Sequence, residues 1–590
     1  MNRIQLTDIE DYLFDCEVII NKADRIVDGV NHGRTVHKGD GVYYKVFHKD
    51  YCRRENFVRA LEVGFFDEIA PALQSLIVDG NDIVGYVTEA GDTSNSSIRD
   101  MSEFFYKDKS IQALQQKLLK LANEKKLFYY DVVPQNTVVL KSGKISLIDL
   151  ESVYDLSELH TIDRHNAIVK PVNYFEELKR LWRENMKKIS FIQPSRNNLK
   201  YLKWSYESIR RNLDKGHEIC WADDFSDDGT WEWMQEIADK DKNVKIHRNE
   251  GPTRLGHTIL YDTLVDMATN DIVMIYHADM YACPGMDVAV LEKLTRGSVV
   301  SATRIEPPLH PDGPEKILKD FGIEPEEFKE KELLEFVEAD LEHSDEKYTR
   351  GIFAPWAMYK DDFLAIGGHD PLYAPQSKED SDIFNRFVLA GYELIQTWQG
   401  FVYHMTCRGS RFKDGAKRNP DGQVFMKGRE TDEWLKQNER STRNFIRKWG
   451  HFVKHDSHMY PIIPPKYDVG FVVENCNNDI LRSLEPWCSD IYGDWVGHKG
   501  MEVNKYIDEE QPDTQFDLSK KIHSQHMNPT NSIVVHIDCQ KLNQQSFQII
   551  TQLSEILSDS GEIGEFNLDI FSVQVKNLNT YEKELIVCES

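Results

Sequence analysis

Two clusters of acidic side chains in the middle of the chain have the position and composition of a ligand site. The first, D-D-F-S-D-D at residues 223–228, follows the apolar run 219–222, and the second, H-A-D at 277–279, follows the apolar run 272–276. Each apolar run predicts a buried strand. Because open α/β sheets bind ligands at the carboxyl ends of their strands, we expect both clusters to lie at such a site.

A simpler explanation is that each cluster is a turn, since Asp, Ser and Gly are common where a strand turns into a helix. After the first cluster, Trp231, Met234 and Ile237 recur at helical spacing, and Ser226 or Thr230 could cap that helix. Two acidic clusters with a helix between them favour a site over two unrelated turns.

With two further motifs, this part of the chain resembles the nucleotide-sugar glycosyltransferases of family 2, which have the GT-A fold. The segment I-S-F-I-Q-P-S-R-N-N at 189–198 resembles the first strand and turn of the family, and Q-S-K-E-D at 376–380 resembles its acceptor-side acidic motif. The resemblance implies a metal-dependent, inverting transferase. Its donor would be a nucleoside-diphosphate sugar, with a UDP-sugar favoured, and its acceptor a glycan, a glycoconjugate or a lipid-linked sugar.

The resemblance also implies a metal site. His277 and Asp279 stand where the family has D-x-D, whose carboxylate binds a divalent cation that bridges the donor phosphates. A histidine in place of the first acid favours Mn²⁺ over Mg²⁺, because imidazole suits softer ions. His404 follows the apolar run 401–403 and resembles a late histidine that completes the metal site in related transferases. A structural histidine is the alternative for His404.

Four residues resemble those that hold the nucleotide in this family. Asp224 is at the position that contacts the base, and Pro194 and Arg196 lie in the turn beside it. Arg196 replaces an aromatic residue that often stacks on the base, which leaves the identity of the base open. Arg254 would supply positive charge beside the diphosphate.

Glu379 and Asp380 resemble the catalytic acidic pair of the family, in which the aspartate removes a proton from the acceptor hydroxyl. The competing explanation is local, because residues 377–380 also look like the capped start of a helix. Both can hold, since a helix N-terminus would keep Asp380 ionised.

Residues 1–180 carry a different signature. Lys45 lies in the alternating run 41–47, Asp131 and Asn136 follow in Y-D-V-V-P-Q-N, and Asp149 ends a later apolar run. This order is the one needed to hold a nucleotide triphosphate, and it resembles the protein-kinase-like superfamily, nearer its sugar and small-molecule kinases. The resemblance implies ATP phosphates on Lys45, Mg²⁺ on Asn136 and Asp149, and Asp131 as the catalytic residue that accepts a hydroxyl proton. A kinase-shaped module without activity is the equal alternative, because I-D-L-E replaces the D-F-G pattern.

The length of 590 residues predicts several domains rather than one core. We expect an α/β multidomain chain with a kinase-like α+β module at 1–180 and a GT-A domain with a Rossmann-like mixed sheet at 187–450. Alternating strands and helices predict a small α/β domain at 460–590. Packing, homo-oligomerisation and acceptor recognition are all open as its role.

Composition narrows the classes of partner. The 71 basic and 98 acidic residues give a net charge of −27, which argues against nucleic acid. The nine cysteines have no C-x-x-C spacing and suggest neither a zinc site nor a disulfide framework. The N-terminus has no signal pattern, and no apolar run approaches the ~18 residues of a membrane-spanning helix, so we expect a cytoplasmic protein.

Two rival functions use the same motifs differently. In one, ATP-dependent phosphoryl transfer by the N-terminal module is the main activity and the central domain only binds sugar. In the other, the chain is a non-catalytic glycan-binding scaffold.

Overall fold

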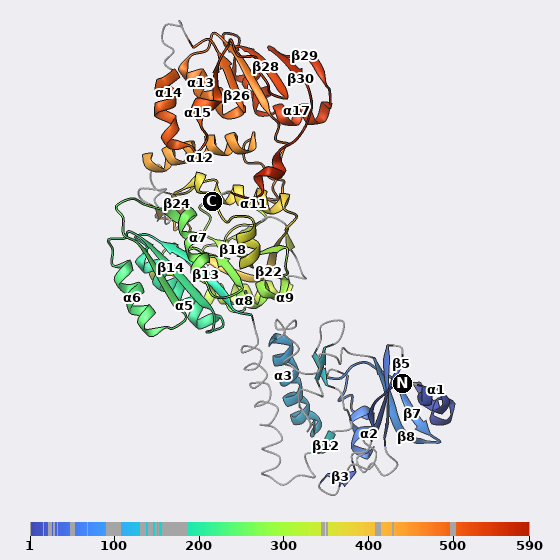
Figure 1. Cartoon of the computed structure of the whole chain (residues 1–590). Helices are drawn as coiled ribbons and strands as arrows, with labels where there is room; N and C mark the ends of the chain where they lie inside the picture. The colour runs from blue at the N-terminus through green and yellow to red at the C-terminus, as the bar shows by residue number, and fades with distance from the viewer. Residues whose placement is uncertain are drawn as a thin grey trace. The chain divides into compact units, whose positions relative to one another are not determined.

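The computed structural model divides the chain into two compact units, residues 1–186 and 187–590 (Figure 1). The boundary lies between the predicted kinase-like and transferase domains, while the predicted separation of a C-terminal domain stays a prediction. The structure describes residues 2–15, 17–21, 26–27, 30–31, 34–39, 41–47, 54–67, 69–89, 108–129, 137–139, 145–147, 150, 153–155, 187–343, 348–349, 352–406, 415–426, 430–495 and 503–588.

The first unit is built on a six-stranded sheet with the order β1-β7-β8-β6-β5-β2. The β1–β7 pair is parallel and the other neighbours are antiparallel. The rings of Phe47, Phe57 and Tyr86 pack together in its core. The strands are β1 (Asn2–Gln5), β2 (Glu17–Asn21), β5 (Arg34–Gly39), β6 (Val42–Phe47), β7 (Leu73–Asp79) and β8 (Asp82–Glu89), and the helices are α1 (Glu10–Asp15), α2 (Arg54–Glu62) and α3 (Asp108–Lys125).

Three short antiparallel pairs complete the described part of this unit: β3 (Ile26–Val27) with β4 (Val30–Asn31), β9 (Leu127–Tyr129) with β12 (Val153–Asp155), and β10 (Thr137–Val139) with β11 (Ile145–Leu147).

The second unit begins with a ten-stranded mixed sheet whose main order is β15-β14-β13-β16-β21-β18-β22-β17. The strands of this path are β13 (Ile189–Ser195), β14 (Glu218–Asp224), β15 (Val244–Asn249), β16 (Ile272–Ile275), β17 (Met280–Ala282), β18 (Ser298–Glu306), β21 (Trp356–Tyr359) and β22 (Glu393–His404). The short strands β19 (Lys316–Leu318) and β20 (Tyr348–Thr349) pair with β18 and β22. The predicted strands at 189–192, 219–222 and 272–276 are confirmed within a few residues.

The four strands β13 to β16 are parallel, and helices separate them in the chain. All seven residues of β14 are buried, as expected of a parallel strand that is covered on both faces. Helix α7 packs on β13 and β14, α5 on β17 and α8 on β22. The helices are α5 (Leu199–Asn212), α6 (Thr230–Lys240), α7 (Gly256–Met267), α8 (Met286–Lys293), α9 (Glu330–His343), α10 (Lys360–Ala365) and α11 (Glu379–Leu389).

A hairpin of β23 (Ala416–Arg418) and β24 (Val424–Met426) precedes the long helix α12 (Asp432–Trp449). Thr431 caps α12 by accepting a hydrogen bond from the Trp434 backbone N–H. On one side, Gln437 and Ser441 of α12 donate to the carbonyl of Gln376, just before α11.

The last part of the chain forms a second sheet, with the order β27-β26-β25-β28-β30-β29 (Figure 1). Its first four strands in this order are parallel, which agrees with the predicted α/β class. The strands are β25 (Val469–Glu474), β26 (Asp490–Gly493), β27 (Ile522–Ser524), β28 (Ile533–Asp538), β29 (Gly564–Leu568) and β30 (Phe571–Val575), and the helices are α13 (Asn478–Leu484), α14 (Val503–Glu510), α15 (Leu518–Lys521), α16 (Gln544–Thr551) and α17 (Leu553–Ser560). No helix among the described residues is both long enough and apolar enough to cross a membrane.

Candidate functional site

The two acidic clusters lie at one edge of the ten-stranded sheet. Strands β14 and β16 both pair in parallel with β13, so their carboxyl ends point the same way. Asp224 is the last residue of β14, and His277 and Asp279 follow β16 directly. The topology therefore brings together the clusters that the sequence placed at strand ends.

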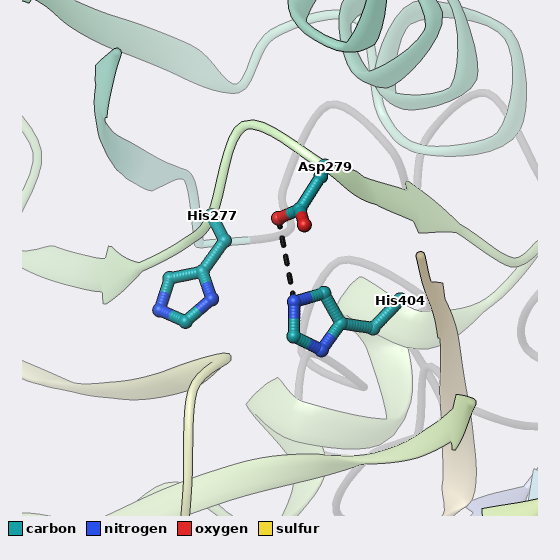
Figure 2. Close-up of side chains that lie close together, drawn as sticks. All are labelled: His277, Asp279 and His404. Carbon is teal, nitrogen blue, oxygen red and sulfur yellow. Dashed lines mark ion pairs between the residues drawn. The ribbon is translucent and has the colours of Figure 1, made fainter. Parts of the chain in front are cut away.

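His404 joins the second cluster through strand pairing. It is the last residue of β22, which pairs antiparallel with β17 so that His404 lies opposite Met280, the neighbour of Asp279. One ligand atom from each of His277, Asp279 and His404 lies within 4.8 Å of the others. Figure 2 shows the three side chains close together. The His404 Nε2 atom is 3.3 Å from Asp279 Oδ1.

Glu306, at the end of β18, holds the far side of the His404 ring. Its Oε1 atom lies 2.8 Å from His404 Nδ1, and Arg304 and Lys316 contact the same carboxylate at 3.2 and 3.7 Å. Burial opposes ionisation of Glu306, but Arg304 and His404 hold its pKa well below the usual range. This anion fixes the orientation of the ring and leaves Nε2 facing Asp279.

The two histidines have opposite acid–base properties. Burial and the neighbouring His404 lower the pKa of His277 to about 3. Burial also opposes the charged form of His404, but Asp279 and Glu306 outweigh it and raise the pKa to about 9. At neutral pH His404 is therefore protonated when no ion is bound, and it would release its Nε2 proton to bind one. After that release, two imidazoles and the Asp279 carboxylate form a donor set that suits Mn²⁺ or a similar divalent ion.

The completely buried side chain of Gln193, in β13, holds the main chain at His277. Gln193 Nε2 donates to the His277 carbonyl at 2.9 Å and to Ser205 Oγ at 2.8 Å. Its Oε1 atom accepts from Trp221 Nε1 at 2.7 Å.

A second group of possible metal ligands, Asp370, Asp382 and Cys588, is already filled by a side chain. The Lys448 ammonium lies 2.7 Å from both carboxylates and 3.7 Å from the Cys588 sulfur. It occupies the place that a cation would take, so this cluster is an internal ion network.

Asp224 organises the start of α7 in this structure. Its carboxylate accepts hydrogen bonds from the backbone N–H groups of Leu255 and Gly256 at 3.0 and 2.9 Å and from the Asn249 side chain at 2.7 Å. Arg254 Nε lies 3.7 Å from the same carboxylate. The predicted base contact of Asp224 would therefore add to these bonds or replace some of them.

The other predicted nucleotide residues lie nearby. Pro194 is in β13 opposite Ala222, and Arg196 follows β13 with its side chain exposed to solvent. Arg254 reaches across to the loop before α11, where its Nη2 atom donates to Gln376 Oε1 at 2.8 Å. Arg254 thus lies between Asp224 and the segment that precedes Glu379 and Asp380.

Glu379 and Asp380 form the first turn of α11, as the sequence predicted. Glu379 is buried, and its Oε1 atom lies 2.6 Å from His257 Nε2 in α7. Asp380 is partly exposed, and no side chain or backbone group in the described part of the chain donates a hydrogen bond to its carboxylate. Burial and the neighbouring Glu379 raise the pKa of Asp380 to about 6.

Of the predicted kinase-like site, the structure describes Lys45 alone. Lys45 is buried in β6, with its Nζ atom 5.6 Å from the centre of the Tyr86 ring. Asp131, Asn136 and Asp149 lie outside the described residues. The arrangement of these four residues therefore stays a prediction.

Sequence reasoning missed two residues of the site, His257 and Glu306. Glu306 ends β18, but the preceding residues, S-V-V-S-A-T-R-I at 298–305, are of mixed polarity. The apolar run that drew attention to Asp224 and Asp279 is therefore missing before Glu306. His257 gives no such signal, because its partner Glu379 lies far away in the sequence and meets it only through packing.

One family model matches the part of the chain that forms this edge of the sheet. Residues 190–352 match the model of Glycosyl transferase family 2, and the match includes both acidic clusters and Glu306. This segment is a glycosyltransferase domain. It covers β13 to β20 of the described structure and ends before the motif that contains Glu379 and Asp380. A search of curated proteins found no match.

Several solved glycosyltransferase structures resemble part of this chain at low identity. GalNAc-T7 with UDP, GalNAc and Mn²⁺ is 17% identical with a TM-score of 0.30, covering 38% of this chain and 43% of that one. The mannosyltransferase PcManGT of Pyrobaculum calidifontis, in complex with GDP-Man and Mn²⁺, is 17% identical with a TM-score of 0.27, covering 38% and 58%. S. aureus TarS with UDP is 14% identical with a TM-score of 0.27, covering 37% and 60%. The chain thus spans less than two thirds of each of these structures.

Proposed function

We propose that the region 187–450 transfers a sugar from a nucleoside diphosphate, most simply UDP, to a hydroxyl group of a glycan or glycoconjugate, with inversion at the sugar carbon. The observation that carries this proposal is the cluster of His277, Asp279 and His404, at the sheet edge where Asp224 also ends its strand. The match of residues 190–352 to the family model supports it.

His277, Asp279 and His404 would hold the divalent cation, and Glu306 would keep His404 oriented toward it. When bound, the cation would balance the charge of the diphosphate leaving group. Arg254 would add positive charge between the donor and the loop before α11, which an otherwise acidic chain must supply locally.

Asp380 would take the proton of the acceptor hydroxyl. Besides burial, Asp380, Glu379 and Asp279 all raise the pKa of the buried Tyr261, so the proposed base and the proposed metal ligands both lie near this tyrosine. As the hydroxyl oxygen forms its bond to the sugar carbon, the bond from that carbon to the diphosphate breaks and the proton passes to Asp380. A base with a raised pKa accepts a proton more readily than an ordinary aspartate.

Thermal stability against a panel of UDP- and GDP-sugars, each with Mn²⁺, Mg²⁺ or a chelator, tests this function because a ligand of the folded state raises the midpoint. We expect a metal-dependent shift with one donor class, and release of the nucleoside diphosphate when an acceptor glycan is added. Asp279→Asn should lose both the shift and the release. Asp380→Asn should keep the shift and lose the release, whereas Glu393→Gln, on the exposed start of β22, should change neither. If no nucleotide sugar gives a metal-dependent shift, the proposal is wrong.

A kinase activity of residues 1–186 on a sugar or lipid-linked acceptor is a second proposal, favoured by the burial of Lys45 inside a central antiparallel strand. Its test is ATP turnover with Mg²⁺ in the presence of candidate sugars. Asp149→Asn should abolish that turnover and leave sugar transfer unchanged. If wild-type protein turns over no ATP, the module is a positioning or binding module.

A further inference from the structure

The first turns of two helices meet beside the proposed base. His257 is the second residue of α7, and its Nε2 atom lies 2.6 Å from the Oε1 atom of Glu379, the first residue of α11. The approach is close, because a Cβ atom added to Gly256 would lie 2.1 Å from the Pro375 carbonyl oxygen. Packing therefore fixes the pairing of His257 with Glu379.

Glu379 and Asp380 are adjacent carboxylates in different surroundings. Glu379 is buried against His257, and its second oxygen, Oε2, has no hydrogen-bond partner in the described structure. Asp380 is partly exposed and forms no ion pair with any residue that the structure describes. Burial opposes ionisation of Glu379, but His257 lowers its pKa, while burial and Glu379 raise the pKa of Asp380. When the surroundings move the pKa values of two neighbouring acids in opposite directions, the acids take separate roles in proton transfer.

The charged and titratable groups around the two carboxylates come from several elements. Helix α7 contributes His257 and Tyr261, β18 contributes Arg304, and the segment before α11 contributes His369. Of these groups, only His257 is in hydrogen-bonding contact with either carboxylate in the described structure. Its charge therefore acts on Glu379 most directly.

We propose that His257 is a positioning residue that keeps Glu379 anionic and so assigns proton acceptance to Asp380. The permanent charge of Glu379 then strengthens Asp380 as a base, and the imidazolium prevents the two acids from sharing one proton. The meaning of this assignment for catalysis rests on the proposed function, but the protonation pattern itself belongs to the protein alone.

The test is the pH at which Asp380 becomes protonated, measured without substrate. A carbodiimide with glycine ethyl ester modifies protonated carboxyl groups, and mass spectrometry of the peptide that contains Asp380 gives the pH midpoint of modification. Glu379→Gln should lower this midpoint by about one pH unit, because a like charge is removed. His257→Asn should lower it as well, because Glu379 then competes for the proton and its charge no longer raises the Asp380 midpoint. Fragmentation of the same peptide should show modification of Glu379 appearing in this variant.

Matched controls are Glu393→Gln and His247→Asn, which make the same exchanges elsewhere in the domain and should leave the midpoint unchanged. Far-ultraviolet circular dichroism checks that every variant is folded. The inference is overturned if Glu379→Gln leaves the midpoint unchanged, or if His257→Asn raises it without any modification of Glu379.

The pH profile of catalysis provides a second measurement. The rising limb of the pH profile of nucleoside diphosphate release should move with the Asp380 midpoint in each variant that retains turnover. If the wild-type protein releases nothing from any donor, the proposed function fails, while the modification midpoints still decide the role of His257.

Discussion

Replacing Glu306 would show how much the proposed metal site depends on the orientation of His404, because the three proposed ligands themselves stay unchanged. Glu306 contacts no proposed ion directly, but its carboxylate fixes the His404 ring. We expect Glu306→Gln to weaken Mn²⁺ affinity by roughly 10- to 100-fold, the usual effect of losing such a partner. Isothermal titration with Mn²⁺ and the nucleoside diphosphate measures it. Glu315→Gln, which alters the same cationic neighbours without touching His404, is the control, and equal losses in both variants would contradict the orienting role.

The raised pKa of Asp380 predicts the pH dependence of turnover. A general base works when it is ionised, so kcat/KM should rise with pH through an apparent pKa near 6, the value to which burial and Glu379 raise Asp380. An ordinary aspartate would place this limb about two units lower. Initial rates of diphosphate release in constant-ionic-strength buffers give the profile. A rate that stays flat from acid to neutral pH would argue against Asp380 as the base.

At the scale of elements, the contact between α7 and the loop before α11 depends on Gly256. Its φ of +76° is in the left-handed region, and an added Cβ would collide with Pro375. We expect Gly256→Ala to destabilise the fold by roughly 2 kcal/mol or more, since strain and overpacking add. Gly391→Ala is the matched control, because its φ is +83° and the space around it is open. Urea unfolding should therefore give a clearly smaller loss for the control, and equal losses would rule out the collision.

The contact of α12 with the C-terminal sheet region rests on a buried ion network. Glu485 accepts hydrogen bonds from Arg447 at 2.6 Å, Lys521 at 2.6 Å and Tyr506 at 2.8 Å, and it is fully buried. Removing one partner of such a network leaves the other charges buried without compensation. We therefore expect Glu485→Gln to lower the free energy of unfolding by about 3–5 kcal/mol at neutral pH. The control is Glu509→Gln, in an exposed pair with Arg482, where a cost below about 1 kcal/mol is expected.

Acid should remove the contribution of Glu485. Burial opposes its ionisation, but Lys521 and Arg447 lower its pKa from the usual 4.5 to about 2. A carboxylate with a depressed pKa stabilises the fold above its unfolded pKa and loses this effect as the pH falls through the folded pKa. The difference in melting temperature between wild type and Glu485→Gln should therefore shrink as the pH falls from 4.5 toward 2. If the difference in melting temperature stays constant over this pH range, the charge of Glu485 does not stabilise the fold.

Local sequence patterns predicted the elements around the site well, because parallel strands are buried on both faces and read as short apolar runs. The strands ending near Asp224 and Asp279 and the helix beginning at Glu379 follow from such runs and their polar ends. The grouping of His404 with the metal motif came from family resemblance, since β22 and β17 pair over a long sequence separation. His257 could not be found in either way, because only the packing of α7 against the loop before α11 brings it to Glu379.

At the scale of the whole molecule, the division at residue 186 predicts how the chain can be cut. A fragment of residues 187–590 should fold and keep the metal-dependent stabilisation by its nucleotide sugar. A fragment that ends at 460 should fold poorly, because Arg447 and Arg443 of α12 would lose the buried acids Glu485 and Glu510. Size-exclusion chromatography and thermal melting of both fragments measure this. If the shorter fragment is monomeric and equally stable, the C-terminal sheet does not support the transferase.

Gln193 makes the main chain of the proposed metal site rigid, which the three proposed ligands alone would not do. This side chain ties the backbone at His277 to Trp221 and Ser205, so the main chain beside the motif is held in place by the core of the sheet. A cation arriving at the site would not have to order that segment, and little conformational entropy would be lost on binding. The affinity for the ion should therefore reflect the chemistry of the three donor groups rather than the folding of a loop.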